Sequence, residues 1–377
     1  MANVVDYLKW RGDLEFRKSP FNEVDNLILT QLVYLDFQGI VPDISESGDI
    51  SLNDAARLYF AKSNQRKKEE IPLLIRDCEK ILKEMMHTVR FGDCRLSHFV
   101  KEVSEVEEFQ FSAMKIVTDD KSIYLSFSGT DSSLAGWKEN FNMSYLEETP
   151  SQRKAVEYAG KVLGMGVRKV RFGGHSKGGN LAVYAAIKSR RAIQNRLIEV
   201  YNFDGPGFTA EMVSREEYQY VLPKIHTIIP QSSVIGMLLE HEEEYQIVES
   251  EEKGLLQHRA YSWQVMGTRL VRMDSLTQDS IFWDGTLKKW IARLNNEERK
   301  SFVNALFAVF EKANINDAEQ LKKITWKKFI TLLRAVDKLS EEERSILSVT
   351  IKKLVDEVEK EKERTRKHRR SNLTFHA

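Results

Sequence analysis

The 377-residue sequence has few cysteines and no long uncharged apolar run, and both absences restrict the compartments in which we expect it. Its only cysteines are Cys78 and Cys94, whereas a secreted protein of this kind more often carries several stapling disulfides. They therefore indicate buried thiols in a reducing compartment. Residues 1–18 are interrupted by charged side chains, unlike a signal peptide or a membrane span. We expect a cytoplasmic protein without a transmembrane segment.

The sequence also lacks a charge imbalance, a metal-binding motif, an internal repeat and a low-complexity tract. Its 57 basic and 56 acidic residues leave a net charge of +1, which steers the protein toward neither nucleic acid nor an anionic membrane. There is no H-E-x-x-H motif, and two distant cysteines cannot form a zinc cluster. We therefore expect no nucleic-acid partner, no metal and no cofactor.

The hydrophobic pattern changes along the chain from mixed helices and strands to helices alone. Strand-like alternation begins near residues 106–117, and strands then alternate with helices as far as residue 248. Strands separated by helices predict an α/β fold with a mostly parallel sheet flanked by helices. Beyond about residue 270 only helical patterns remain. The sequence therefore predicts a domain over residues 1–270 and a helical extension with a charged tail over residues 271–377.

One pentapeptide in the α/β region has the pattern of a catalytic turn. Residues 174–178 read Gly-His-Ser-Lys-Gly, between a strand-like run at 167–172 and a helix of small residues at 179–186. A serine on a sharp strand-to-helix turn holds its hydroxyl outward, and small neighbours permit the turn. This context predicts a nucleophile elbow with Ser176 as the nucleophile.

A serine nucleophile requires donors for the oxyanion that its attack creates. The backbone N–H of Lys177 opens the helix after the elbow and is one predicted donor. A second is predicted at Thr130, because residues 122–127 form an apolar strand followed by a turn at Gly129. The carboxyl ends of parallel strands meet at one edge of the sheet, so both donors should lie near Ser176.

The nucleophile also requires a base, and the histidine order along the chain favours His258. It follows the strand-like residues 245–248 and completes the order serine, acid, histidine. His241 is the alternative base. His175 lies within the elbow, where its ring should point away from the Ser176 hydroxyl.

These motifs resemble a known group of enzymes. The Phe-Ser-Gly-Thr run at 127–130, the Gly-Trp-Lys-Glu-Asn-Phe run at 136–141, the elbow and the Val-Tyr-Asn-Phe run at 200–203 resemble the class 3 lipase branch of the α/β-hydrolases. The N-terminal residues 5–13 and the Gln257-His258 segment more closely resemble the bacterial, lipase-like Mbeg1-like family of unknown function, over residues 1 to about 270. The resemblance implies an α/β-hydrolase fold, with Ser176 as nucleophile, His258 as base and Thr130 in the oxyanion hole.

The third member of the triad departs from the lipase pattern. The lipases carry an aspartate in a setting where this sequence has Ser232 and Ser233. Asp204, at the end of the preceding strand, is a candidate substitute. It could equally be a turn former, since Asp before Gly is common in turns. The acidic run that contains Glu240 and residues 242–244 is less favoured, because such runs are usually solvated.

Two functions are compatible with these residues. The first is a serine esterase or lipase-like hydrolase that cleaves a carboxylic ester or thioester of a small-molecule or lipid-like substrate. The alternative is a catalytically decayed hydrolase fold that binds or scaffolds, because the expected acid is missing and the Lys177 side chain could obstruct the pocket or select an anion. The apolar stripe of the last helix, which includes Leu347 and Ile351, could dock on the body or form a homo-oligomer.

Overall fold

The computed structural model describes residues 2–63, 71–130, 134–313, 332 and 335–374. These residues form two compact units: Met1–Asp131 with Glu148–Leu276, and Ser132–Glu147 with Thr277–Ala377. The strands of the first unit are β1 (Ile50–Ser51), β2 (Arg95–Ser104), β3 (Phe109–Val117), β4 (Ile123–Phe127), β5 (Val170–His175), β6 (Leu197–Phe203), β7 (Ile225–Pro230), β8 (Tyr245–Val248), β9 (Val265–Met266) and β10 (Arg269–Leu270). Its helices are α1 (Val4–Arg11), α2 (Glu23–Leu32), α3 (Leu52–Ser63), α4 (Leu73–Met85), α6 (Pro150–Leu163), α7 (Lys177–Lys188), α8 (Arg191–Gln194), α9 (Ala210–Val213) and α10 (Glu216–Val221), with 3-10 turns η2 (Leu222–Lys224), η3 (Gly254–His258) and η4 (Ala260–Ser262).

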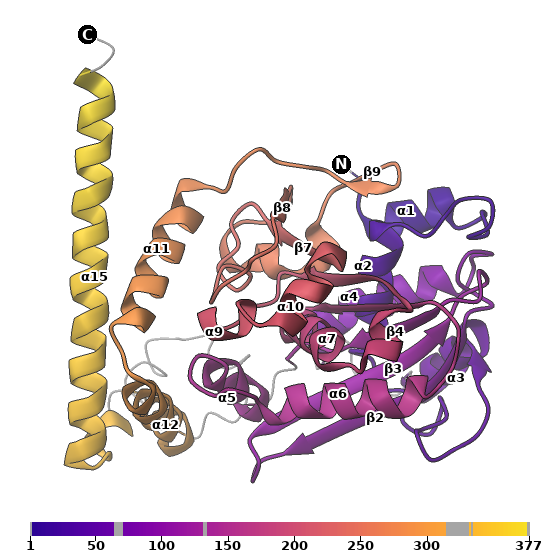
Figure 1. Cartoon of the computed structure of the whole chain (residues 1–377), viewed down its shortest axis with the longest axis horizontal. Coiled ribbons are helices and arrows are strands. Elements are labelled where there is room, and N and C mark those ends of the chain that lie inside the picture. The colour runs from indigo at the N-terminus through magenta and orange to yellow at the C-terminus, as the bar shows by residue number, and fades with distance from the viewer. Residues whose placement is uncertain (1, 64–70, 131–133, 314–331, 333–334, 375–377) are drawn as a thin grey trace. The chain divides into compact units, whose positions relative to one another are not determined.

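The first unit is built on an eight-stranded sheet whose spatial order follows the chain from β1 to β8. Figure 1 labels β2, β3, β4, β7 and β8 of this sheet. Strands β1 to β4 pair antiparallel, and β4 to β8 pair parallel. Helices connect the parallel strands from β4 to β7. This arrangement confirms the α/β-hydrolase fold, and it brings the carboxyl ends of β4, β5, β6 and β7 to one edge of the sheet.

Two apolar cores lie on opposite faces of this sheet. Tyr124 of β4 belongs to the core that includes α1, α2 and α4, whereas its neighbour Leu125 belongs to the core formed with α6, α7 and α10. Successive side chains of a strand point to opposite faces, so one strand supplies both cores. Each large apolar side chain that is fully buried contributes about 1.5–3 kcal/mol. The sheet is therefore covered by packed apolar side chains on both faces.

The packing of α7 depends on its small residues. Gly179, Ala182, Ala185 and Ala186 are all buried against the sheet. A β-carbon on Gly179 would lie 2.0 Å from Asn202 Oδ1 of β6. The helix after the elbow can therefore lie close to the strands only because its inner face lacks bulk.

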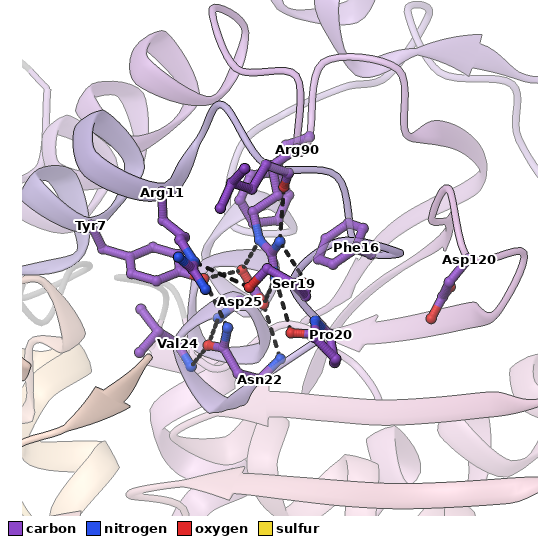
Figure 2. Close-up of polar contacts among 12 residues, drawn as sticks. Tyr7, Arg11, Phe16, Ser19, Pro20, Asn22, Val24, Asp25, Arg90 and Asp120 are labelled. Atoms are coloured by element: carbon purple, nitrogen blue, oxygen red, sulfur yellow. Dashed lines mark hydrogen bonds and ion pairs between the residues drawn. The ribbon is translucent and has the colours of Figure 1, made fainter. Parts of the chain in front are cut away.

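A buried ion pair between Asp25 and Arg90 holds the N-terminal helices within the first unit (Figure 2). Helix α2 begins with a capping box, because the Asn22 and Asp25 side chains each accept a backbone N–H of the other residue. Asp25 also accepts from Tyr7 Oη at 2.8 Å and from Arg90 Nε at 2.6 Å. The other guanidinium N–H groups of Arg90 donate to Asp25 and to the carbonyls of Leu14, Ser19 and Pro20. Every donor of this buried arginine is satisfied, as a buried charge requires.

The second unit, as far as its residues are described, is helical and includes α5 (Leu134–Asn142), α11 (Gln278–Ala292), α12 (Asn296–Lys312) and α15 (Glu341–Thr374). Trp290 Nε1 of α11 donates to Thr350 O of α15 at 3.1 Å, and Arg293 forms a 2.8 Å ion pair with Glu357. Leu347 is buried within this unit, whereas Ile351 is half exposed. The apolar stripe of α15 thus packs partly against its own unit.

The boundary between the two units differs from the domain boundary that the sequence predicts at residue 270. The first unit extends to Leu276, and Ser132–Glu147 groups with the C-terminal helices. Arg299 Nη1 of α12 donates to Ser144 O at 2.6 Å, and the rings of Phe141 and Phe307 lie 6.1 Å apart. These contacts join segments more than 150 residues apart, which periodicity cannot show. Among the described helices, none combines the length and apolarity needed to cross a bilayer.

Candidate active site

The sharp turn predicted around Ser176 lies between β5 and α7. Ser176 is the N-cap of α7 and has φ 59° and ψ −135°. A residue with a side chain adopts a positive φ only when the surrounding structure enforces it, and such strain gathers at functional sites. Gly178 permits the elbow to lie close to the end of β4, since a β-carbon on it would lie 2.1 Å from Phe127 O. The strand-turn-helix geometry matches a nucleophile elbow.

The loop after β4 lies against this turn. Phe127 of β4 is paired with Gly174 of β5, so the residues that follow each strand are neighbours. A β-carbon on Gly129 would lie 2.9 Å from Ser176 Cβ and 2.5 Å from His175 O. Thr130, the next residue, is thus brought close to the elbow. Lys177 occupies the first position of α7, where a backbone N–H has no acceptor within its own helix.

The Lys177 side chain does not extend into solvent beside the nucleophile. It is fully buried, and its Nζ donates to Gln110 O of β3. The Lys177 ammonium group is therefore held by a hydrogen bond inside the first unit. This placement leaves the backbone N–H as the part of Lys177 that is relevant to an oxyanion.

Asp204 and His258 lie in direct contact at the end of β6. His258 Nδ1 is 2.6 Å from Asp204 Oδ2, and their side chains are 27% and 1% exposed, respectively. The buried carboxylate can thus hold the ring while one edge of the ring remains accessible. A carboxylate at Nδ1 leaves Nε2 to act as the base.

The alternative role of Asp204 as a turn former is filled by Asn202. Gly205 N donates to Asn202 Oδ1 at 2.9 Å, and Asn202 Nδ2 donates to Gly205 O at 3.2 Å. Asp204 itself has φ 52°, a conformation that aspartate tolerates better than most residues. The turn is therefore stabilised by the neighbouring asparagine, while the Asp204 side chain points to His258.

The serine found in the place of the lipase aspartate contacts Asp204. Ser233 Oγ donates to Asp204 Oδ1 at 2.5 Å, and Gly236 N donates to the same oxygen at 3.1 Å. Both carboxylate oxygens are thus engaged, one by donors of the loop after β7 and the other by His258. The position that carries the acid in lipases here supports an acid from the neighbouring strand.

His258 and Ser176, the predicted base and nucleophile, lie near each other without a hydrogen bond between their side chains. Within the described residues, no hydrogen bond joins Ser176 Oγ to His258. The rings of His175 and His258 are 4.7 Å apart, which places His258 beside the residue that precedes the nucleophile. Catalytic hydrogen bonds are often long without substrate, so the missing bond does not exclude His258 as the base of Ser176.

His241, the alternative base, belongs to a separate buried pair. Its Nδ1 lies 3.1 Å from Glu243 Oε1, while Tyr218 and Thr227 donate their hydroxyls to the same carboxylate. The expectation that residues 242–244 are all solvated was wrong for Glu243, which is buried. Burial alone raises the pKa of Glu243, but the hydrogen bond and charge of His241, with the two hydroxyls, lower it to about 2.

The cysteines and the other acidic groups form no further site in the described part of the chain. Cys78 and Cys94 are free and buried, and burial raises the pKa of each thiol. Between residues 2 and 374, the described His, Cys, Asp and Glu side chains form no cluster of three that could hold a metal.

Comparisons with known proteins give a family and a distant likeness to lipases. A family model described as Mbeg1-like matches residues 85–308. Similar solved structures include M37 lipase, with 13% identity, a TM-score of 0.35, and coverage of 56% of this chain and 69% of the lipase. The propeptide complex of Rhizomucor miehei lipase has 18% identity, a TM-score of 0.28, and coverage of 41% and 57%. No curated protein matches the sequence.

Proposed function

This chain belongs to the Mbeg1-like family, and we propose that it is a lipase-like serine hydrolase that cleaves a carboxylic ester or thioester through an acyl-enzyme. The observation that carries the proposal is the 2.6 Å contact between Asp204 Oδ2 and His258 Nδ1, beside the strained turn at Ser176. A decayed scaffold has no need to keep a buried carboxylate on a histidine next to a strained serine.

In the proposed reaction, Ser176 Oγ attacks the carbonyl carbon of the substrate while His258 Nε2 takes the hydroxyl proton. The carbonyl oxygen becomes an oxyanion, which the backbone N–H groups of Lys177 and Thr130 stabilise. His258 then protonates the departing alcohol or thiol, and the acyl group remains on Ser176. Water, deprotonated by His258, releases the carboxylic acid and restores the serine.

Asp204 has two tasks in this scheme. It keeps the Nδ1–H tautomer of His258, so that Nε2 can accept the serine proton, and it stabilises the imidazolium that forms. Its second oxygen is held by Ser233 and Gly236, which fixes the direction of the carboxylate. The scheme requires no cofactor.

The proposal also includes the setting in which the enzyme works. The free, buried Cys78 and Cys94 support a reducing, cytoplasmic compartment. The substrate is a small-molecule or lipid-like ester, and the balanced charge of the chain offers no basis for nucleic-acid binding. Assembly of two chains through the C-terminal helices remains a prediction, to be checked by light scattering.

A fluorophosphonate probe tests the proposal, because it labels only a serine whose hydroxyl is activated. Wild-type protein should be labelled once, and Ser176→Ala should remove the label without changing the thermal unfolding midpoint. Ser214→Ala is the matched control, since Ser214 is an exposed serine that bonds only locally to Glu211 O. Absence of labelling in the folded wild-type protein would favour the binding or scaffold alternative.

A further inference from the structure

The residue before the nucleophile contacts the backbone of the base. His175 Nε2 lies 2.6 Å from His258 O, and His175 Nδ1 lies 3.0 Å from Tyr34 Oη. The His175 ring is buried beneath the elbow. The His175 imidazole therefore links the end of β5, next to Ser176, to the turn that contains His258.

The partners of His175 determine its tautomer. A carbonyl oxygen can only accept, so Nε2 must carry the proton that is donated to His258 O. Burial, together with the neighbouring charge of His258, lowers the pKa of His175 to about 3. The neutral ring then has an unprotonated Nδ1 facing the Tyr34 hydroxyl, which lies 3.0 Å from both Nδ1 and His175 O and can donate to either. His175 is thus a fixed donor to the His258 backbone.

The other contacts of the turn that contains His258 do not connect its backbone to the residue before Ser176. Trp263 Nε1 donates to Gln257 O at 2.8 Å, and Arg259 pairs with Asp77 and Glu252. These bonds hold the residues on either side of His258. The hydrogen bond with Asp204 orients the His258 ring, but it does not fix the distance between the His258 backbone and the elbow. Only the His175 bond ties the His258 backbone to the residue adjacent to the nucleophile, within the described residues.

From this geometry we propose that His175 is a positioning residue, which sets the distance between the base His258 and the nucleophile Ser176 by donating to the His258 carbonyl. The inference rests on the proposed hydrolase function. It assigns to the elbow histidine a structural hydrogen bond and no proton transfer with the substrate. A misplacement of the base by about 1 Å is enough to lower a rate by about a hundredfold.

Two substitutions of His175 distinguish the roles of its two ring nitrogens. The amide nitrogen of Gln can occupy the place of Nε2, so His175→Gln retains a donor for His258 O. The shorter Asn reaches only the place of Nδ1, so His175→Asn loses that donor while remaining polar. Both variants remove the imidazole, so any difference between them reports on the bond to His258.

The first measurement is the rate of fluorophosphonate labelling of the full chain as a function of pH. We expect His175→Asn to be labelled about a hundredfold more slowly. Its residual rate should lose the dependence on a single ionisation, because a displaced His258 cannot accept the Ser176 proton during the reaction. His175→Gln should stay within about tenfold of wild type and keep its pH profile. Mere loss of folded protein would lower the labelled fraction but preserve the profile.

The second measurement is amide hydrogen exchange across residues 254–263, which requires no activity. Exchange should become faster in His175→Asn and remain near wild type in His175→Gln. Equal labelling rates and equal exchange in the two variants would refute the positioning role, even if wild type is labelled. If wild type is not labelled, the proposed hydrolase function fails, while a difference in exchange would still support the His175–His258 tether.

Discussion

Ser233 donates a 2.5 Å hydrogen bond to Asp204 Oδ1, while the other oxygen of the same carboxylate contacts His258. A serine thus stands where the lipase resemblance placed an aspartate, and it supports the acid that replaces it. The two residues follow adjacent parallel strands, β6 and β7, and the pairing of these strands brings their side chains together.

The acid and its supporting serine should differ in their effect on turnover. Asp204→Asn should lower kcat by up to about 10⁴-fold, because an amide at this position favours the wrong His258 tautomer. Ser233→Ala should lower it by about ten- to a hundredfold, since Gly236 N still holds the carboxylate and a hydrogen bond to a charged group contributes about 1.5–3 kcal/mol. Steady-state hydrolysis of a p-nitrophenyl ester checks both variants. Equal activity of Asp204→Asn and wild type would exclude Asp204 from the triad.

The two histidine–carboxylate pairs should separate activity from stability. His258→Ala should lower turnover by several orders of magnitude, because the proposed base is removed. His241→Ala should leave turnover near wild type but lower the free energy of unfolding by about 1–3 kcal/mol, because Glu243 loses a buried partner. Ester hydrolysis and urea denaturation of both variants test this ranking, and the reverse ranking would make His241 the base.

Acid should destabilise the protein in two steps with different causes. The pKa of His175 is lowered to about 3 in the folded state, so below its ordinary value of 6.5 the unfolded chain binds a proton that the folded chain does not. Stability is therefore full above pH 6.5 and falls as the pH decreases, by about 1.4 kcal/mol per pH unit. Glu243, with a folded pKa of about 2 and an ordinary value of 4.5, adds a loss below pH 4.5.

The His175 contribution can be isolated by substitution. His175→Gln removes the titrating ring, so the difference in unfolding free energy between wild type and variant should shrink as the pH decreases from 6.5 to 4.5. Urea denaturation at several pH values in this window measures that difference. A constant difference would show that His175 does not titrate differently on unfolding.

The buried ion pair of the N-terminal helices should contribute far more than an exposed one. Arg90→Ala leaves Asp25 buried without its main partner, which should cost about 3–5 kcal/mol. Arg95→Ala is the matched control, because the Arg95–Asp49 pair is about half exposed and should cost no more than about 1 kcal/mol. Equilibrium denaturation compares the two. Similar losses would mean that the buried pair is dispensable.

Two glycines should respond in opposite directions to the same substitution. Gly178→Ala would place a methyl group 2.1 Å from Phe127 O, so the elbow must distort and labelling of Ser176 should fall sharply. Gly160→Ala, in the exposed part of α6, meets no atom within 4 Å and should stabilise the protein by up to about 1 kcal/mol. Thermal unfolding and probe labelling of both variants measure these effects.

The nucleophile turn was predictable because its signal is local in the sequence. Gly174, Ser176 and Gly178 lie within five residues, and the strand before and the helix after them are recognisable from composition. The start of α2 was equally predictable, since a capping box requires only Asn22 and Asp25. For the same reason the parallel part of the sheet followed from alternating strands and helices.

The surroundings of Asp204, the proposed triad acid, are determined by the tertiary structure. Sequence alone left Asp204 divided between turn former and triad acid, because the choice depends on Asn202, Ser233 and His258, which reach it only in the folded chain. Glu243 lies in an acidic run that composition marks as solvated, yet the side chains around it bury it. Packing also groups Ser132–Glu147 with the C-terminal helices. Interactions between neighbours in the chain are encoded by spacing, whereas these contacts depend on how distant segments pack.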